Sequence, residues 1–198
     1  MTTEFVTTGA GPESSISAVS WPAILAGAVI AIAVSLIMFT LGSGLGAAAL
    51  SPWPGVGPTA TTFSVMTGVW LILTQWISSA VGGYLTGRLR TKWAGTHSHE
   101  VFFRDTAHGF LTWGVATVVV AGLAALASAA AGPAVHAAAS ALSTSGIADS
   151  ADTAREAADA ARKAAAAFSF FTALSMLIGA FIACVAAALG GQQRDEHV

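Results

Sequence analysis

The chain has 198 residues, of which 55% are hydrophobic and 9% are charged, whereas typical soluble domains carry about 25% charged residues. A net charge of −2 lacks the basic footprint of nucleic-acid binding, so no nucleic-acid partner is expected. The single cysteine, Cys184, excludes an intrachain disulfide and a cysteine-rich zinc site. With a mean hydropathy of +0.72, the composition excludes a soluble enzyme and predicts an integral membrane protein.

Three long stretches contain no Asp, Glu, Lys or Arg: 14–87, 106–148 and 164–193. A helical membrane span takes about 20 apolar residues, so the first stretch has room for two. Residues 51–58, with three prolines and two glycines, separate these two spans. The stretches lack the alternation of barrel strands, which leaves helices as the structure that satisfies the backbone in lipid.

The sequence therefore predicts an all-α integral membrane protein built as a bundle of four transmembrane helices. This membrane domain covers 22–191, with polar tails at 1–21 and 192–198. Because Gly132 and Pro133 follow the third apolar stretch, that helix is expected to end there. The expected spans are about 22–49, 62–87, 107–131 and 166–190.

The loop expected at 88–106 carries Arg88, Arg90, Lys92 and Arg104, whereas the first-to-second loop carries no charge. By the positive-inside rule this basic loop faces the cytoplasm, which places both termini there as well. The four basic side chains are expected to meet anionic lipid headgroups.

The outer segment, 132–165, is rich in alanine, the strongest helix former. Asp149 or Ser150 is suited to cap a helix that starts near 150 and continues unbroken into the fourth span. Asp159 and Lys163 have the spacing of a stabilising helical ion pair. This helical extension is either a solvated continuation of the span or a docking arm for an extracytoplasmic partner.

Small residues recur at every fourth position on three of the expected helices, which lets helix backbones approach closely in lipid. Gln75, the most polar side chain in any span, shares a face with Ser79. It serves either an interhelical hydrogen bond or the wall of a polar pathway. The residues expected at helix contacts are Ala23, Gly27, Ala31, Gly42, Gly46, Gln75, Ser79, Gly83, Gly87, Gly179, Ala183 and Ala187.

The basic loop also contains His97, His99 and His108, whose ring nitrogens are zinc ligands in other proteins. Their spacing matches no metal motif, and side chains two residues apart point away from each other on a helix. The favoured interpretation is a lead-in helix at the membrane interface, with Asp105 as cap of the third span. We therefore expect neither a metal nor another cofactor.

The segment from Thr74 to Trp93, TQWISSAVGGYLTGRLRTKW, and the segment from Glu100 to Phe110, EVFFRDTAHGF, resemble a family of small bacterial inner-membrane proteins. Some members of this family carry the label "PhnA-like". The resemblance covers about 20–125 and implies a bacterial inner-membrane location. It implies no catalytic residue for this chain.

The sequence favours a structural, accessory or interaction role, in which the bundle packs in the lipid bilayer against itself or a larger membrane complex. An oligomeric channel or transporter that uses the Gln75 face is the alternative. A membrane enzyme built on the His97–His108 loop is the third hypothesis, and a catalytic role is not the favoured one.

Overall fold

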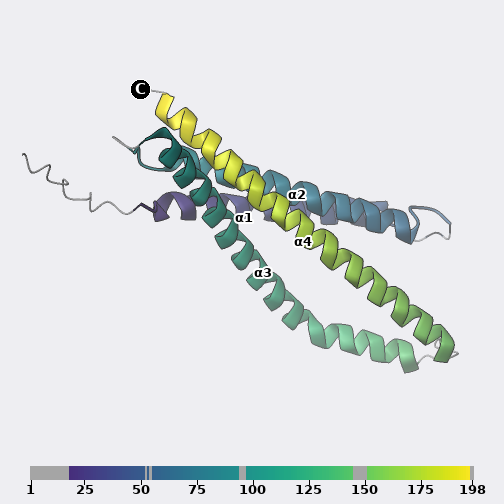
Figure 1. Cartoon of the computed structure of the whole chain (residues 1–198). Helices are drawn as coiled ribbons and strands as arrows, with labels where there is room; N and C mark the ends of the chain where they lie inside the picture. Colours follow the sequence, from purple (N-terminus) through teal and green to yellow (C-terminus); the bar gives the residue numbers. More distant parts are fainter. Residues whose placement is uncertain (1–17, 52, 54, 94–96, 145–150, 197–198) are drawn as a thin grey trace, which may run out of the picture.

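The computed structural model describes residues 18–51, 53, 55–93, 97–144 and 151–196. Within these ranges the chain is all-helical, which confirms the expected fold class, and each helix contains a stretch long and apolar enough to cross a membrane. The protein is thus a multi-pass membrane protein. Its helices (Figure 1) are α1 (Trp21–Ala49), α2 (Ala60–Leu89), α3 (Ser98–Thr144) and α4 (Ala151–Glu196).

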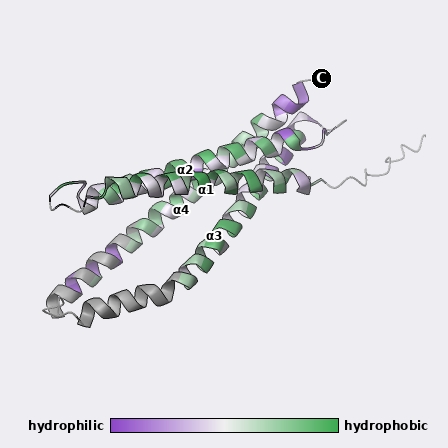
Figure 2. Ribbon diagram, turned by 180° about the vertical axis from the view of Figure 1, so that it is seen from behind, coloured by the Kyte–Doolittle hydropathy of each residue, from purple (hydrophilic) through white to green (hydrophobic). Residues whose placement is uncertain are grey.

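The four helices are gathered at one end of the molecule, whereas at the other end they form two separate pairs, α1 with α2 and α3 with α4 (Figure 1). α2 packs against both α1 and α4, while α3 contacts its neighbours near the C-terminal end of α4. From there α3 and α4 diverge, and the bend in the later part of α3 brings their outer ends together again (Figure 1). Hydrophilic residues lie at the gathered end and on the first turns of α4, with apolar helix between them (Figure 2).

The helices differ in length, which divides the molecule into a membrane bundle and an outer arm. At 1.5 Å per residue, α1 and α2 are roughly 45 Å long and α3 and α4 roughly 70 Å. The hydrocarbon core is about 30 Å thick, so the last part of α3 and the first part of α4 extend beyond it. We call this pair of segments, 131–144 and 151–167, the outer arm.

The expected ends of the first two spans lie within two residues of the observed helix ends, but the third does not. α3 begins at Ser98 rather than near 107 and continues through Gly132 and Pro133 to Thr144, so the predicted stop was wrong. A proline inside a helix removes one hydrogen bond and bends the helix without necessarily ending it. α3 changes direction in its later part (Figure 1).

α4 follows the prediction of one unbroken helix through the extension and the fourth span. It runs from Ala151 to Glu196, so most of the tail expected at 192–198 is helical. The expected caps, Asp149 and Ser150, lie outside the described residues, as do 1–17 of the N-terminal tail. On the arm, the Asp159 carboxylate lies 2.7 Å from Lys163 and 2.6 Å from Arg162. These two cations lower the pKa of Asp159.

The turn between α1 and α2 depends on glycine. Gly55 and Gly57 have φ angles of +74° and +114°, which side-chain-bearing residues rarely adopt. Thr59 then caps α2 by accepting a hydrogen bond from the Thr62 backbone N–H at 3.2 Å. The turn therefore reverses the chain and starts the second span within ten residues.

The small residues of α2 and α4 face each other along the central contact of the bundle. A Cβ atom on Gly83 would collide with the backbone of Ala183, and one on Gly87 would collide with the backbone of Ala187. Gly179 lies against the Gln75 side chain and Ser79 in the same contact. Helix association in lipid depends on such close packing, because lipid tails are as apolar as the side chains.

A second small-residue contact joins α1 to α2. Gly27 leaves room for Gly82 and Thr86, and the neighbouring Ala23 and Ala31 are buried. Farther along α1, Gly42 accommodates the Trp70 ring, whose Nε1–H donates to the Met38 carbonyl at 2.9 Å, and Gly46 lies beside Phe63. The residues expected at helix contacts therefore lie where α1, α2 and α4 meet inside one chain.

Gly83→Leu is expected to lower the free energy of unfolding by about 1–3 kcal/mol, because overpacking separates α2 from α4. Gly44→Leu is the matched control, since a Cβ atom on Gly44 of α1 would meet nothing within 4 Å. Thermal unfolding in detergent measures both. Equal midpoints for the two variants would contradict a specific contact at Gly83.

Candidate functional site

Arg90 lies at the gathered end, directly after the last residue of α2. Its backbone is extended, with φ −64° and ψ 158°, and its N–H still donates to the Thr86 carbonyl at 3.2 Å. This change of direction turns the side chain inward, and Arg90 is 0% exposed. A fully buried guanidinium is costly unless charges and hydrogen-bond acceptors surround it.

Two carboxylates from different helices surround Arg90. Asp105 of α3 forms a bidentate pair with it, through Nε to Oδ1 and through Nη2 to Oδ2 at 2.9 Å. Asp195 of α4 accepts from Nη2 at 2.8 Å and from Nη1 at 3.4 Å. The carbonyls of Thr91 and Gly191 accept at 3.1 and 3.5 Å. We call Arg90, Asp105 and Asp195 the arginine cluster.

The charges of the cluster keep Arg90 protonated. Burial by itself would lower the pKa of Arg90. The hydrogen bonds and Coulomb attraction of Asp105 and Asp195 outweigh burial, so the pKa is raised. One positive charge thereby joins the ends of α2, α3 and α4.

Glycine makes room for this cluster on α4. A Cβ atom on Gly191 would overlap the Asp105 carboxylate, and one on Gly190 would overlap the Tyr84 carbonyl. The small-residue contact between α2 and α4 thus continues directly into the cluster. Two further hydrogen bonds join α4 to the end of α2 beside the cluster. The Tyr84 hydroxyl donates to Gln193 Oε1 at 2.6 Å, and Arg194 Nε donates to the Arg90 carbonyl at 3.3 Å.

His108 joins α1 to the same end of the bundle. It is 2% exposed, and its Nε2 accepts a hydrogen bond from the Ser20 backbone N–H at 2.8 Å. This bond assigns the remaining ring proton to Nδ1, which faces the Arg104 carbonyl. The neutral imidazole therefore satisfies an N–H at the start of α1, where helices leave such groups without partners.

Trp93 covers this histidine from the α2–α3 connection. The centroid of its ring lies 6.1 Å from that of His108, and the Arg104 guanidinium lies over the indole at 4.9 Å. Arg104 also pairs with Glu100 at 2.7 Å. A cation stacked on an indole face is attracted to the ring electrons, so the connection is held against α3.

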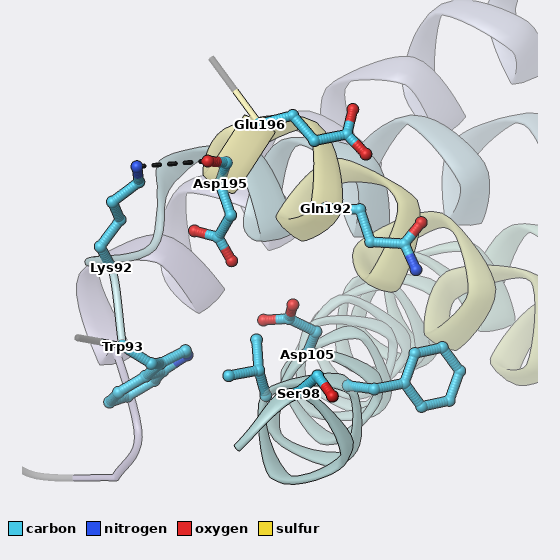
Figure 3. Close-up of a pocket in the computed structure, with 9 residues that line it drawn as sticks. Lys92, Trp93, Ser98, Asp105, Gln192, Asp195 and Glu196 are labelled. Carbon is cyan, nitrogen blue, oxygen red and sulfur yellow. Dashed lines mark hydrogen bonds between the residues drawn. The ribbon is translucent and has the colours of Figure 1, made fainter. Parts of the chain in front are cut away.

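A pocket of about 500 Å³ lies beside the arginine cluster and is lined by Asp105 and Asp195, whose side chains point toward each other (Figure 3). Lys92 donates from Nζ to the backbone carbonyl of Asp195 at 3.3 Å. Because Arg90 already engages both carboxylates, the arrangement resembles a structural ion pair rather than an acid–base pair ready for catalysis. Other lining residues are Trp93, Ser98, Val101, Phe102, Gln192 and Glu196.

The prediction that Arg90 meets lipid headgroups was wrong, because its guanidinium is buried between two carboxylates. Lys92 is exposed, and Arg88 and Arg104 are partly exposed, so these three retain access to solvent or headgroups. The expected capping role of Asp105 was also wrong. α3 starts seven residues earlier, which places Asp105 inside the helix on the face toward Arg90.

The histidines do not converge. His97 and His99 are exposed, while both nitrogens of the buried His108 face backbone groups. No group of three or more His, Cys, Asp or Glu side chains that could hold a metal occurs in the part of the chain that the structure describes.

The sequence interpretation missed Asp105 and Asp195 as partners of Arg90. A usable signal was present, since Arg90, Asp105 and Asp195 each lie within three residues of the end of an uncharged stretch. Charges at the same membrane depth on adjacent helices are candidates for pairing.

No family model, curated protein or solved structure matches this chain.

Arg90→Met is expected to lower the free energy of unfolding by about 3–5 kcal/mol, because it leaves the buried Asp105 carboxylate without its cation. Arg88→Met, two residues away and partly exposed, is the control and should cost less than about 1 kcal/mol. Chemical unfolding in mixed micelles measures both. A similar loss of unfolding free energy in both variants would show that burial of the ion pair does not stabilise the bundle.

Proposed function

We propose that this chain is a structural or interaction protein of a bacterial inner membrane, which assembles with other transmembrane helices as a homo-oligomer or within a larger complex. The observation that carries this proposal is the contrast between the two ends of the helix bundle. One end is fixed by the arginine cluster and His108, whereas α3 from 118 to 130 is exposed at every residue. The exposed fractions of Val118 and Leu126 are 73% and 69%.

The exposed part of α3 is suited to contact another helix. Most of its residues are Ala, Gly or Ser, and a Cβ atom on Gly122 would meet nothing within 4 Å. Small side chains permit the backbone-to-backbone approach by which membrane helices associate. Most glycines of α1, α2 and α4 already pack against another helix of the same chain, so we place the assembly contact on this part of α3.

The proposed orientation places the arginine cluster in the cytoplasm and the outer arm outside. Arg88, Lys92 and Arg104 lie at the gathered end, whereas the α1–α2 turn has no charged residue. The positive-inside rule supports this orientation, because basic residues in short loops are retained on the cytoplasmic side. The resemblance of 20–125 to small bacterial inner-membrane proteins supports the same location.

The assembly proposal predicts that Gly122→Leu shifts the purified protein toward the monomer without unfolding it. The added side chain meets open space within the chain but blocks the approach of another helix. Gly44→Leu is the matched control, since Gly44 on α1 also has open space around it.

Native mass spectrometry in mild detergent measures the oligomeric state of the wild type and both variants. A wild-type protein that is monomeric, or an oligomer that Gly122→Leu leaves unchanged, would contradict assembly through this part of α3.

The orientation is tested with single cysteines in a Cys184→Ala background. Cysteines at Thr59 and at Glu156, both exposed positions, should react with an impermeant thiol reagent in intact cells. A cysteine at Ser98 should react only after the membrane is permeabilised. Labelling of Ser98 in intact cells, with no labelling at Thr59 and Glu156, would show that the orientation is the opposite of the one proposed.

A further inference from the structure

The pocket beside the arginine cluster lies where two helix ends of opposite polarity meet. α3 begins at Ser98 and α4 ends at Glu196, and both residues line the pocket. The first N–H groups of a helix carry a partial positive charge, and its last carbonyls carry a partial negative charge. The start of α3 therefore favours an anion in the pocket, and the end of α4 favours a cation.

Carboxylates strengthen the negative side of the pocket at the end of α4. Asp195 and Glu196 both line it, the Asp195 side chain is 36% exposed, and Glu196 is exposed. Arg90 binds Asp195 from within the bundle but does not line the pocket, because it is fully buried. The arginine cluster has one guanidinium for two carboxylates, so the pocket meets an excess of negative charge at this side.

Lys92 supplies the positive side chain of the pocket. It is the one basic residue among the described residues that line the pocket, and it is exposed. One of its three Nζ protons is donated to the Asp195 backbone carbonyl at 3.3 Å, whereas the Asp195 carboxylate points toward Asp105 (Figure 3). Neither Lys92 nor Glu196 forms an ion pair within the described part of the chain. Both charges therefore remain available to a ligand.

An apolar wall connects the pocket to the lipid-facing surface. Trp93, Val101 and Phe102 line it, and Phe102 is 53% exposed. Phe103, the next residue of α3, is 64% exposed. Exposed apolar rings lie in lipid, whereas the charged groups of this end lie among the head groups, because burying an unpaired charge in hydrocarbon is costly. The pocket is thus placed at the boundary between head groups and acyl chains.

We propose that this pocket binds the head group of a zwitterionic phospholipid with a primary ammonium group, as in phosphatidylethanolamine. Asp195 and Glu196 hold the ammonium, Lys92 and the start of α3 hold the phosphate, and the acyl chains leave past Phe102. A volume of about 500 Å³ lies within the range of about 300–1,000 Å³ of small-molecule sites. The site goes beyond the proposed assembly role and does not depend on contact through α3.

The polar groups of the pocket discriminate between common phospholipids. A primary ammonium donates three hydrogen bonds to carboxylate oxygens, whereas the trimethylammonium of phosphatidylcholine donates none. Phosphatidylglycerol has the phosphate but no cation, so it meets the carboxylates of α4 with a net negative charge. A hydrogen bond between charged groups is worth about tenfold in affinity. Phosphatidylethanolamine is therefore expected to bind about tenfold more tightly than either of the other two lipids.

The test is a lipid titration of the wild-type protein in mild detergent, followed by native mass spectrometry. The probes are dioleoyl phosphatidylethanolamine, dioleoyl phosphatidylcholine and dioleoyl phosphatidylglycerol, added one at a time. Saturable binding of one phosphatidylethanolamine per chain, with weaker binding of the other two, is the expected result. Equal affinities for all three lipids, or preference for phosphatidylglycerol, would overturn the proposal.

Variants at the two sides of the pocket are expected to differ in which lipids they affect. Lys92→Met should weaken binding of all three lipids roughly two- to tenfold, because the phosphate is common to them. Glu196→Gln removes a negative charge and should weaken binding of phosphatidylethanolamine alone, by a similar factor. The matched controls are Lys163→Met and Glu156→Gln, which change exposed residues of the outer arm.

Asp195→Asn keeps an oxygen that accepts from Arg90 and should reduce the preference for phosphatidylethanolamine over phosphatidylcholine. Thermal unfolding establishes that each variant is folded before binding is compared. A preference unchanged by both Asp195→Asn and Glu196→Gln, or losses of the same size in the outer-arm controls, would show that the lipid binds elsewhere.

A last comparison separates a lipid from a free head group. Glycerophosphoethanolamine carries the same charged groups without acyl chains and dissolves in water. It is expected to displace phosphatidylethanolamine only at concentrations far above that of the lipid, because it lacks the contact past Phe102. Displacement at equal concentrations would show that the pocket binds a soluble zwitterion and would overturn the assignment to a lipid.

Discussion

The need to surround a buried guanidinium with acceptors organises the gathered end of this molecule. Arg90 is fully buried, and two carboxylates supply the compensating charge. For both to reach it, α3 has to begin early enough to include Asp105, and α4 has to continue as far as Asp195. Gly191 has to lack a side chain so that Asp105 can lie against α4. Ion pairing, helix length and backbone packing therefore depend on one another.

His108 completes this end by a different interaction. The arginine cluster joins α2, α3 and α4, and the hydrogen bond from the Ser20 N–H adds α1. Although these interactions hold the four helices together at one end, α3 diverges from the other helices farther along, because it shares few close contacts with its neighbours beyond Ala116. The exposed part of α3 is a consequence of this divergence.

The small residues of the membrane helices fall into two groups, those that pack inside the chain and those that remain open to a partner. Gly83, Gly87 and Ala183 pack inside the chain and are unavailable to a partner. Gly122 has the same chemistry but open surroundings. A glycine in a membrane helix permits close approach, and the tertiary structure decides whether that approach is made by the same chain or by another.

The sequence by itself determined the membrane class, the four helices and the small residues at which they meet. Long stretches without charged residues are required of helices that cross lipid, and small residues four positions apart are required where such helices pack closely, so both can be recognised locally in the sequence. It did not determine the continuation of α3 through Pro133, since the bilayer and neighbouring helices decide whether a proline bends a helix or ends it. Nor did it determine that Arg90 pairs with Asp195, 105 residues away. Only the tertiary structure decided these features and the pocket beside the arginine cluster, because each arises from helix ends and faces that are distant in the chain.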